Sequence, residues 1–149
     1  MTQPFNWKRL ALIGALATTP QGRRTRLFLS IHSGTVNSER VTAFLRGLRR
    51  CIPGRVLLLW DGLPSHRSTH TAQFLADNRH WLHVERLRAY APELNPVEYL
   101  WGHLTATDLA NFTADDLDIL ARQIRKGTRR VRRHPDLPHA FLKHSGLFS

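Results

Sequence analysis

The stretch from Arg55 to Gly62 reads RVLLLWDG, a continuous apolar run that ends in an acid and a glycine. A short apolar run of this kind is typical of a strand that is buried on both faces. Asp61 then stands at the carboxyl end of the strand, which is where α/β sheets carry their functional groups. Asp61-Gly62 is also a common turn dipeptide, so this position alone leaves a functional and a purely structural interpretation open.

The segments before this strand predict a hairpin and a helix. Leu10–Ala17 is apolar, and Thr25–His32 alternates between apolar and polar residues, so the two read as paired strands. Asn37 can cap a helix over residues 38–52, where apolar side chains recur at helical spacing. Pro53-Gly54 then ends that helix.

The segments after the strand alternate again. A short helix is expected over Ser68–Asn78, a strand over Leu82–Leu87, a helix from Pro96 and a last helix from near Thr113. The predicted order is β-β-α-β-α-β-α-α, which indicates an α/β fold with a mixed sheet and flanking helices. The expected domain spans 1–149, with a core over about 8–112 and a basic helical segment over about 113–149.

The composition indicates a globular, strongly basic protein. The 149 residues are 42% apolar, and 22 Lys and Arg against 11 Asp and Glu give a net charge of +11. Such a charge favours a phosphate-bearing partner, most often nucleic acid. Cys51 is the only cysteine, which excludes an internal disulfide and fits a reducing cytoplasm. Leu10–Ala17 is too short to cross a membrane, so no membrane partner is expected.

Positive charge is concentrated in one segment near the end of the chain. The segment 122–133 contains no acid. It reads either as a solvated helix face or as a surface that contacts nucleic-acid phosphates, and the overall charge favours the second interpretation. Its seven basic residues are Arg122, Arg125, Lys126, Arg129, Arg130, Arg132 and Arg133.

Glu98 is a second acid at a defined structural position. Asn95 can cap the helix that begins at Pro96, and Glu98 is then the third helical residue, the position of the acid in a capping box. That structural role explains Glu98 by itself. Glu98 also follows the strand expected to lie beside the one that ends in Asp61, and two carboxylates on neighbouring elements can bind Mg²⁺.

Two histidines are candidate metal ligands. His66 and His70 are four residues apart, a spacing that can bind zinc on a helix, but the sequence offers no evident third ligand. A contact of His66 with DNA or with the carboxylates is the better interpretation.

Two longer stretches together resemble a known family. LLLWDGLPSHRS at 57–68 and LRAYAPELNPVEYLWGHL at 87–104 are similar to the carboxyl-terminal part of the catalytic domain of mariner-like DDE transposases from bacterial insertion sequences. In that family an Asp ends a central strand, a His follows, and a Pro-Glu-Leu-Asn-Pro segment leads to the last catalytic Glu. Asp61, His66 and Glu98 match these positions, with 36 residues between the two acids.

The resemblance implies an RNase H-like fold and DNA cleavage and joining with Mg²⁺ or Mn²⁺ at a two-metal site. Asp61 and Glu98 would be catalytic metal ligands, and the partners would be transposon-end and target DNA in the bacterial cytoplasm, near the nucleoid. The family's first catalytic Asp has no counterpart, because Glu39 is the only acid before Asp61. We therefore expect a sheet without its first, central strand and a truncated or split-frame copy that is inactive alone.

Such a copy could pair with an upstream transposase fragment or form a homodimer. Two other functions stay open, a non-catalytic nucleic-acid-binding protein and a stand-alone nuclease. A third carboxylate beside Asp61 and Glu98 would favour an enzyme, and its absence would favour the binding protein.

Overall fold

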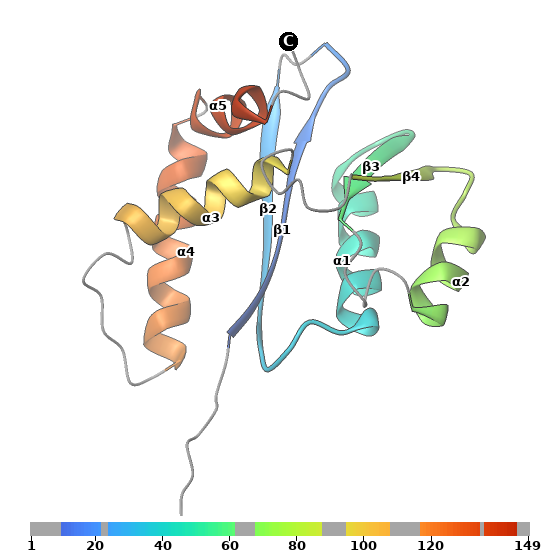
Figure 1. Cartoon of the computed structure of the whole chain (residues 1–149), viewed down its shortest axis with the longest axis horizontal. Coiled ribbons are helices and arrows are strands. Elements are labelled where there is room, and N and C mark those ends of the chain that lie inside the picture. The colour runs from blue at the N-terminus through green and yellow to red at the C-terminus, as the bar shows by residue number, and fades with distance from the viewer. Residues whose placement is uncertain are drawn as a thin grey trace, which may run out of the picture. The chain divides into compact units, whose positions relative to one another are not determined.

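The computed structural model describes residues 10–21, 24–61, 68–87, 95–107, 117–134 and 136–145. The described elements are, in order, β1 (Leu10–Thr18), β2 (Thr25–Ser33), α1 (Ser38–Cys51), β3 (Val56–Trp60), α2 (Thr69–Asp77), β4 (Leu82–Arg86), α3 (Pro96–Thr107), α4 (Leu117–Arg133) and α5 (Asp136–His144) (Figure 1). They belong to two compact units, one formed by residues 1–35 and 96–149 and the other by residues 36–95.

The first unit is a β-hairpin with three helices. β1 and β2 pair antiparallel, from Leu10 opposite Ser33 to Thr18 opposite Thr25. Figure 1 shows α3, α4 and α5 gathered beside this hairpin. Its core contains apolar side chains from one strand and all three helices, because each helix turns its apolar face toward β2 or toward its neighbours. The buried cluster consists of Leu27, Leu100, Leu104, Val131 and Phe141.

The second unit begins with helix α1. Asn37 caps it, and its Oδ1 accepts a hydrogen bond from the Arg40 backbone N–H over 2.9 Å. Val41, Leu45 and Leu48 are buried along one face, as the helical spacing predicts. The helix ends before Gly54, whose φ of 82° lies in the left-handed region that favours glycine.

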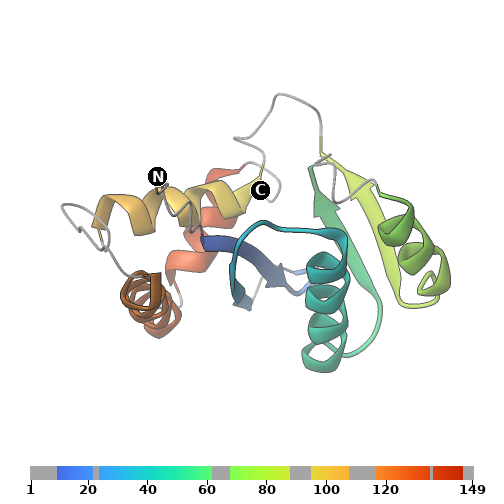
Figure 2. The ribbon, with the colours of Figure 1, turned by 90° about the horizontal axis from the view of Figure 1, so that it is seen from below.

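A parallel strand pair completes the second unit. β3 pairs with β4 from Val56 opposite Leu82 to Trp60 opposite Arg86. Figure 2 shows α2 alongside β4, and α2 also packs on α1. Parallel strands need such a crossover because the end of the first strand and the start of the second lie at opposite ends of the pair.

Most of the predicted elements are confirmed to within a residue or two, including the hairpin and the order up to α3. The prediction that β3 is buried on both faces is wrong at Leu57, which is 60% exposed. Side chains alternate between the two faces of a strand, and Leu57 points to the face opposite that of Val56 and Leu58, which are half-buried. α5 was not predicted, and Thr113 lies outside the described residues.

How the two strand pairs align, and hence the expected single mixed sheet with a missing strand, stays a prediction, as do the predicted domain limits. Among the described helices, none has the length and apolar character that crossing a bilayer requires.

Candidate functional site

Asp61 follows directly after β3. It is half-buried, at the carboxyl end of a parallel strand pair. The Leu87 N–H donates to the Trp60 carbonyl over 2.7 Å, so the ladder between β3 and β4 continues up to the residue before Asp61. The backbone that carries this carboxylate is therefore fixed on one side by regular sheet hydrogen bonds.

Beyond Asp61, the next described residue is Ser68. Ser68 caps α2 and accepts a hydrogen bond from the Thr71 N–H over 3.1 Å. The Ser38 hydroxyl, in the first turn of α1, donates to the Ser68 hydroxyl over 2.5 Å. These contacts tie the start of α2 to the start of α1. His66 lies outside the described residues, so its predicted contact stays a prediction.

Glu98 is exposed in the first turn of α3, as the sequence predicts. The N-terminus of a helix carries a partial positive charge, which favours a carboxylate there. Two and six residues further along α3, Leu100 and Leu104 enter the core cluster of the first unit. A buried helix face therefore holds the helix start that presents Glu98 to solvent.

The contact that seats α3 on the hairpin was missed by the sequence analysis. A Cβ atom built on Gly14 of β1 would lie 2.8 Å and 2.9 Å from Cη2 and Cζ2 of the Trp101 ring, and 3.4 Å from Cγ1 of Val97. No ordinary side chain fits between β1 and this ring. Gly14 in an otherwise apolar strand was the available signal, since a glycine inside a strand often marks a close approach.

The two candidate acids lie in different units, Asp61 in residues 36–95 and Glu98 in the unit that includes residues 96–149. Their convergence and their role as metal ligands thus stay predictions. Among the described residues, no group of three or more His, Cys, Asp and Glu could hold a metal ion. Carboxylate oxygens are the ligands that Mg²⁺ prefers, so the side chains of Asp61 and Glu98 have the chemistry that two ligands of such an ion would need.

His70, the other histidine of the candidate zinc pair, is exposed on α2, and its Nε2 lies 3.1 Å from Oγ1 of Thr42 on α1. This contact joins the two helices of the second unit.

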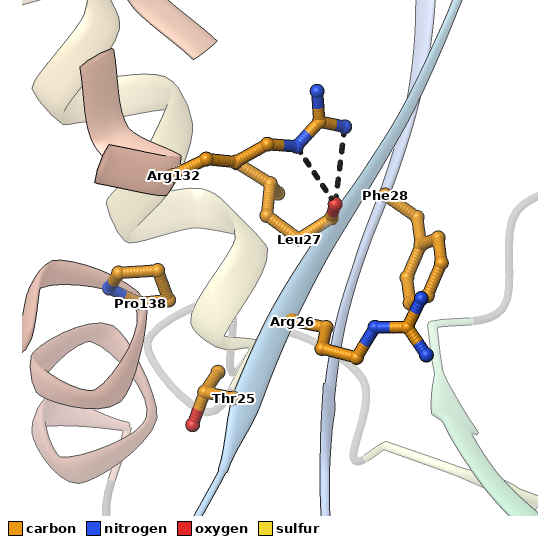
Figure 3. A pocket seen from close by; sticks show the side chains of 6 residues that line it. All are labelled: Thr25, Arg26, Leu27, Phe28, Arg132 and Pro138. Atoms are coloured by element: carbon orange, nitrogen blue, oxygen red, sulfur yellow. Dashed lines mark hydrogen bonds between the residues drawn. The ribbon is translucent and has the colours of Figure 1, made fainter. Parts of the chain in front are cut away.

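The basic run lies on α4, and the structure divides its seven members. Arg132 donates from Nε and Nη2 to the Leu27 carbonyl of β2, over 3.1 Å each (Figure 3). Arg130 Nη2 lies 3.2 Å from Nε2 of His103 on α3. These two arginines thus connect α4 to neighbouring elements of the first unit. Arg132 is itself exposed, as are the other five members: Arg122, Arg125, Lys126, Arg129 and Arg133.

Arg132 also lines a pocket of about 370 Å³ together with residues of β2 and Pro138 of α5 (Figure 3). Arg26, at the same pocket, stacks on Phe28, with 4.9 Å between Cζ and the ring centroid. Both guanidinium groups have contacts within the chain, so the pocket is best explained by packing between β2, α4 and α5.

Residues 2–121, which include both candidate acids, match the family model described as DDE superfamily endonuclease. The chain belongs to the DDE superfamily of endonucleases. No curated protein sequence matches it. The mixed α/β fold predicted from the sequence agrees with this family, whose catalytic domains are RNase H-like.

Solved structures of similar fold include transposase domains. The Mos1 transposase catalytic domain with raltegravir and Mg is 18% identical, with a TM-score of 0.56 over 94% of this chain and 84% of that one. The Mos1 mariner transposase catalytic domain is 16% identical, with a TM-score of 0.56 over 94% and 83%. The Mos1 transposase paired-end complex with the left transposon end is 16% identical, with a TM-score of 0.55 over 93% of this chain and 55% of that one. At these identities the similarity shows the fold.

Proposed function

We propose that this chain acts in mariner-like DNA transposition, in which Asp61 and Glu98 are two carboxylates of a metal-dependent DDE centre. The observation that carries the proposal is the match of residues 2–121 to the DDE endonuclease family, with Asp61 at a strand end and Glu98 at a helix start. The Mos1 domains of similar fold were solved with Mg and with Mn, which supports divalent ions as cofactors. A Mos1 paired-end complex contains a transposon end, which supports DNA as the partner.

When bound, the metal ions would activate a water or a 3′-hydroxyl and stabilise the charge on the reacting phosphate. The residues of this chain would fix where those ions lie. β3 and its ladder to β4 would hold Asp61, and the packing of α3 on β1 would hold Glu98. His66 would contact DNA or one of the carboxylates.

Two carboxylates are a small set of ligands for a two-metal site. Before Asp61 the sequence contains only one acidic residue, Glu39, which lies exposed in the first turn of α1. We propose that a third carboxylate comes from outside these 149 residues, on a strand that would join the sheet, supplied by an upstream transposase segment in the same or another polypeptide. A homodimer is the alternative way to assemble a complete site.

Metal binding tests the assignment of the two acids directly. Titration with Mn²⁺, followed by electron paramagnetic resonance, should show a weak site that Asp61→Asn and Glu98→Gln each abolish. Glu39→Gln is the matched control, because Glu39 is also an exposed glutamate in the first turn of a helix. Equal loss of binding in all three variants, or no loss in the first two, would contradict the assignment.

A plasmid-nicking assay tests the activity. With Mg²⁺ or Mn²⁺ the 149-residue chain alone should not nick supercoiled DNA, because one weakly held ion cannot stabilise both the attacking and the leaving oxygen. Co-expression with the upstream coding segment should restore nicking that depends on Asp61. Nicking by the chain alone that Asp61→Ala removes would favour the stand-alone nuclease. DNA binding without any Mn²⁺ site would favour the non-catalytic binding protein.

A further inference from the structure

Helix α4 has two opposite faces of different chemistry. Its buried residues lie on one side of the helix and are Ala121, Ile124, Gly127, Thr128 and Val131. The opposite side carries five of the six exposed basic residues, which we call the basic stripe: Arg122, Arg125, Lys126, Arg129 and Arg133. With successive residues about 100° apart around the axis, these five fall within a sector of about 100°. The sequence alone showed a basic run, but not this separation.

The two remaining arginines of the run lie on the flanks of the stripe. The helical repeat places Arg130 about 80° to one side of the centre of the stripe and Arg132 about 80° to the other side. The Arg130 guanidinium reaches His103, and that of Arg132 reaches the Leu27 carbonyl (Figure 3). These flanking contacts fix the rotation of α4 about its axis, so the basic stripe is held facing away from the core.

The stripe carries a high local charge. Over the part of the chain that the structure describes, none of its five members forms an ion pair with an acid. One acid, Asp118, precedes the stripe in the same sector, four residues before Arg122. The segment from Arg125 to Arg133 is therefore the most positive part. From Arg122 to Arg133 the helix rises about 16 Å.

We propose that the basic stripe is a docking surface for the phosphate backbone of duplex DNA. Duplex DNA carries one negative charge per about 1.7 Å of its axis, so a stripe of this length faces several phosphates at once. Four of the five residues are arginines, whose planar guanidinium groups can bind phosphate oxygens in pairs. An anionic membrane fits less well, because a helix that lies on a membrane inserts its apolar face, and that face of α4 is buried in the core.

The choice of DNA as the partner rests on the proposed function, but the surface can be tested without catalysis. Binding to a 30-base-pair duplex is measured by fluorescence anisotropy in EDTA, between 50 mM and 200 mM salt. Five phosphate contacts give a slope of log K against log salt of about −4.5, which is about a 500-fold loss of affinity over this range. The variant Arg125→Gln/Arg129→Gln/Arg133→Gln should reduce the slope to about −1.8. If the variant and the wild type bind DNA equally at 1 M salt, this difference in slope makes the variant bind about 500-fold more weakly at 0.1 M salt.

A matched control removes the same charge elsewhere. Arg50, Arg55 and Arg86 are exposed arginines of the other unit. The variant Arg50→Gln/Arg55→Gln/Arg86→Gln should keep the wild-type slope, and both triple variants should keep the wild-type melting temperature because the changed side chains are exposed.

Three results would overturn the proposal: a stripe variant with an unchanged slope, a control variant that loses as much affinity, or wild-type binding to phosphatidylserine vesicles that is as tight as binding to DNA. An Asp61→Asn chain that binds DNA with the wild-type slope would separate the two proposals, since the stripe then works whether or not Asp61 is catalytic.

Discussion

Replacing Gly14 by alanine tests how α3, and with it Glu98, is held on the hairpin. The added Cβ would lie 2.8 Å from Cη2 and 2.9 Å from Cζ2 of Trp101. Both atoms belong to a rigid ring, so the clash cannot be relieved by turning the end of a flexible side chain. Either the Trp101 side chain changes rotamer or α3 moves away from β1.

The expected cost follows from this overlap. Inserting a methyl group into a packed core costs about 1–3 kcal/mol, and replacing glycine by alanine within a strand returns about 0.5–1 kcal/mol. The net loss should be about 1–2 kcal/mol in the free energy of unfolding, which corresponds to about 2–8 °C in melting temperature for a chain of this size. Thermal unfolding followed by circular dichroism measures it. Mn²⁺ affinity should also fall if Glu98 is a ligand.

Two further variants make the test specific. Gly102 lies on α3, and apart from the helix's own nearby backbone nothing lies within 4 Å of a built Cβ, so Gly102→Ala should stabilise the chain by about 0.5–1 kcal/mol. In Gly14→Ala/Trp101→Leu the smaller side chain gives the new methyl group room. The double variant should therefore lose less stability than the sum of the single losses, by about 0.5–3 kcal/mol. An unchanged melting temperature for Gly14→Ala, or strictly additive losses, would refute the reasoning.

Three other predictions concern the contacts around the site. Arg132→Gln should lower the free energy of unfolding by about 1 kcal/mol, because a β2 carbonyl loses its two donors, while the salt slope of DNA binding stays unchanged. Ser68→Ala should destabilise by about 0.5–2 kcal/mol through loss of the cap of α2, as measured by denaturant unfolding, whereas Ser68→Thr should retain most of the stability. In a Cys51→Ser background, the pair Asp61→Cys/Glu98→Cys should be joined by a short thiol-reactive cross-linker, and its failure to react would argue against convergence.

Much of the fold could be predicted because its signals are local. Asn37 and the apolar spacing after it determine α1, since a cap and one buried stripe suffice to define an amphipathic helix. The burial of a strand is not local. Leu57 lies in a run that reads as buried, yet it is exposed, because burial depends on which elements cover each face of the sheet. The sequence pattern also did not predict where the last helices begin and end, and it did not predict α5.

The candidate site likewise has features that the sequence predicts and features that only the tertiary structure shows. The sequence by itself determined the residues with the right chemistry, Asp61 after an apolar strand and Glu98 in a first helical turn, because both positions depend only on neighbours along the chain. It also determined that residues 122–133 are basic.

The tertiary structure decided what those residues contact. It showed that a glycine of β1 makes room for Trp101, and that Arg130 and Arg132 hold α4 so that its basic stripe faces outward. Side chains distant in sequence make these contacts, and Arg132 reaches a carbonyl 105 residues away. Local propensity contains no information about such a partner, because the contact exists only once the helices have packed on the hairpin.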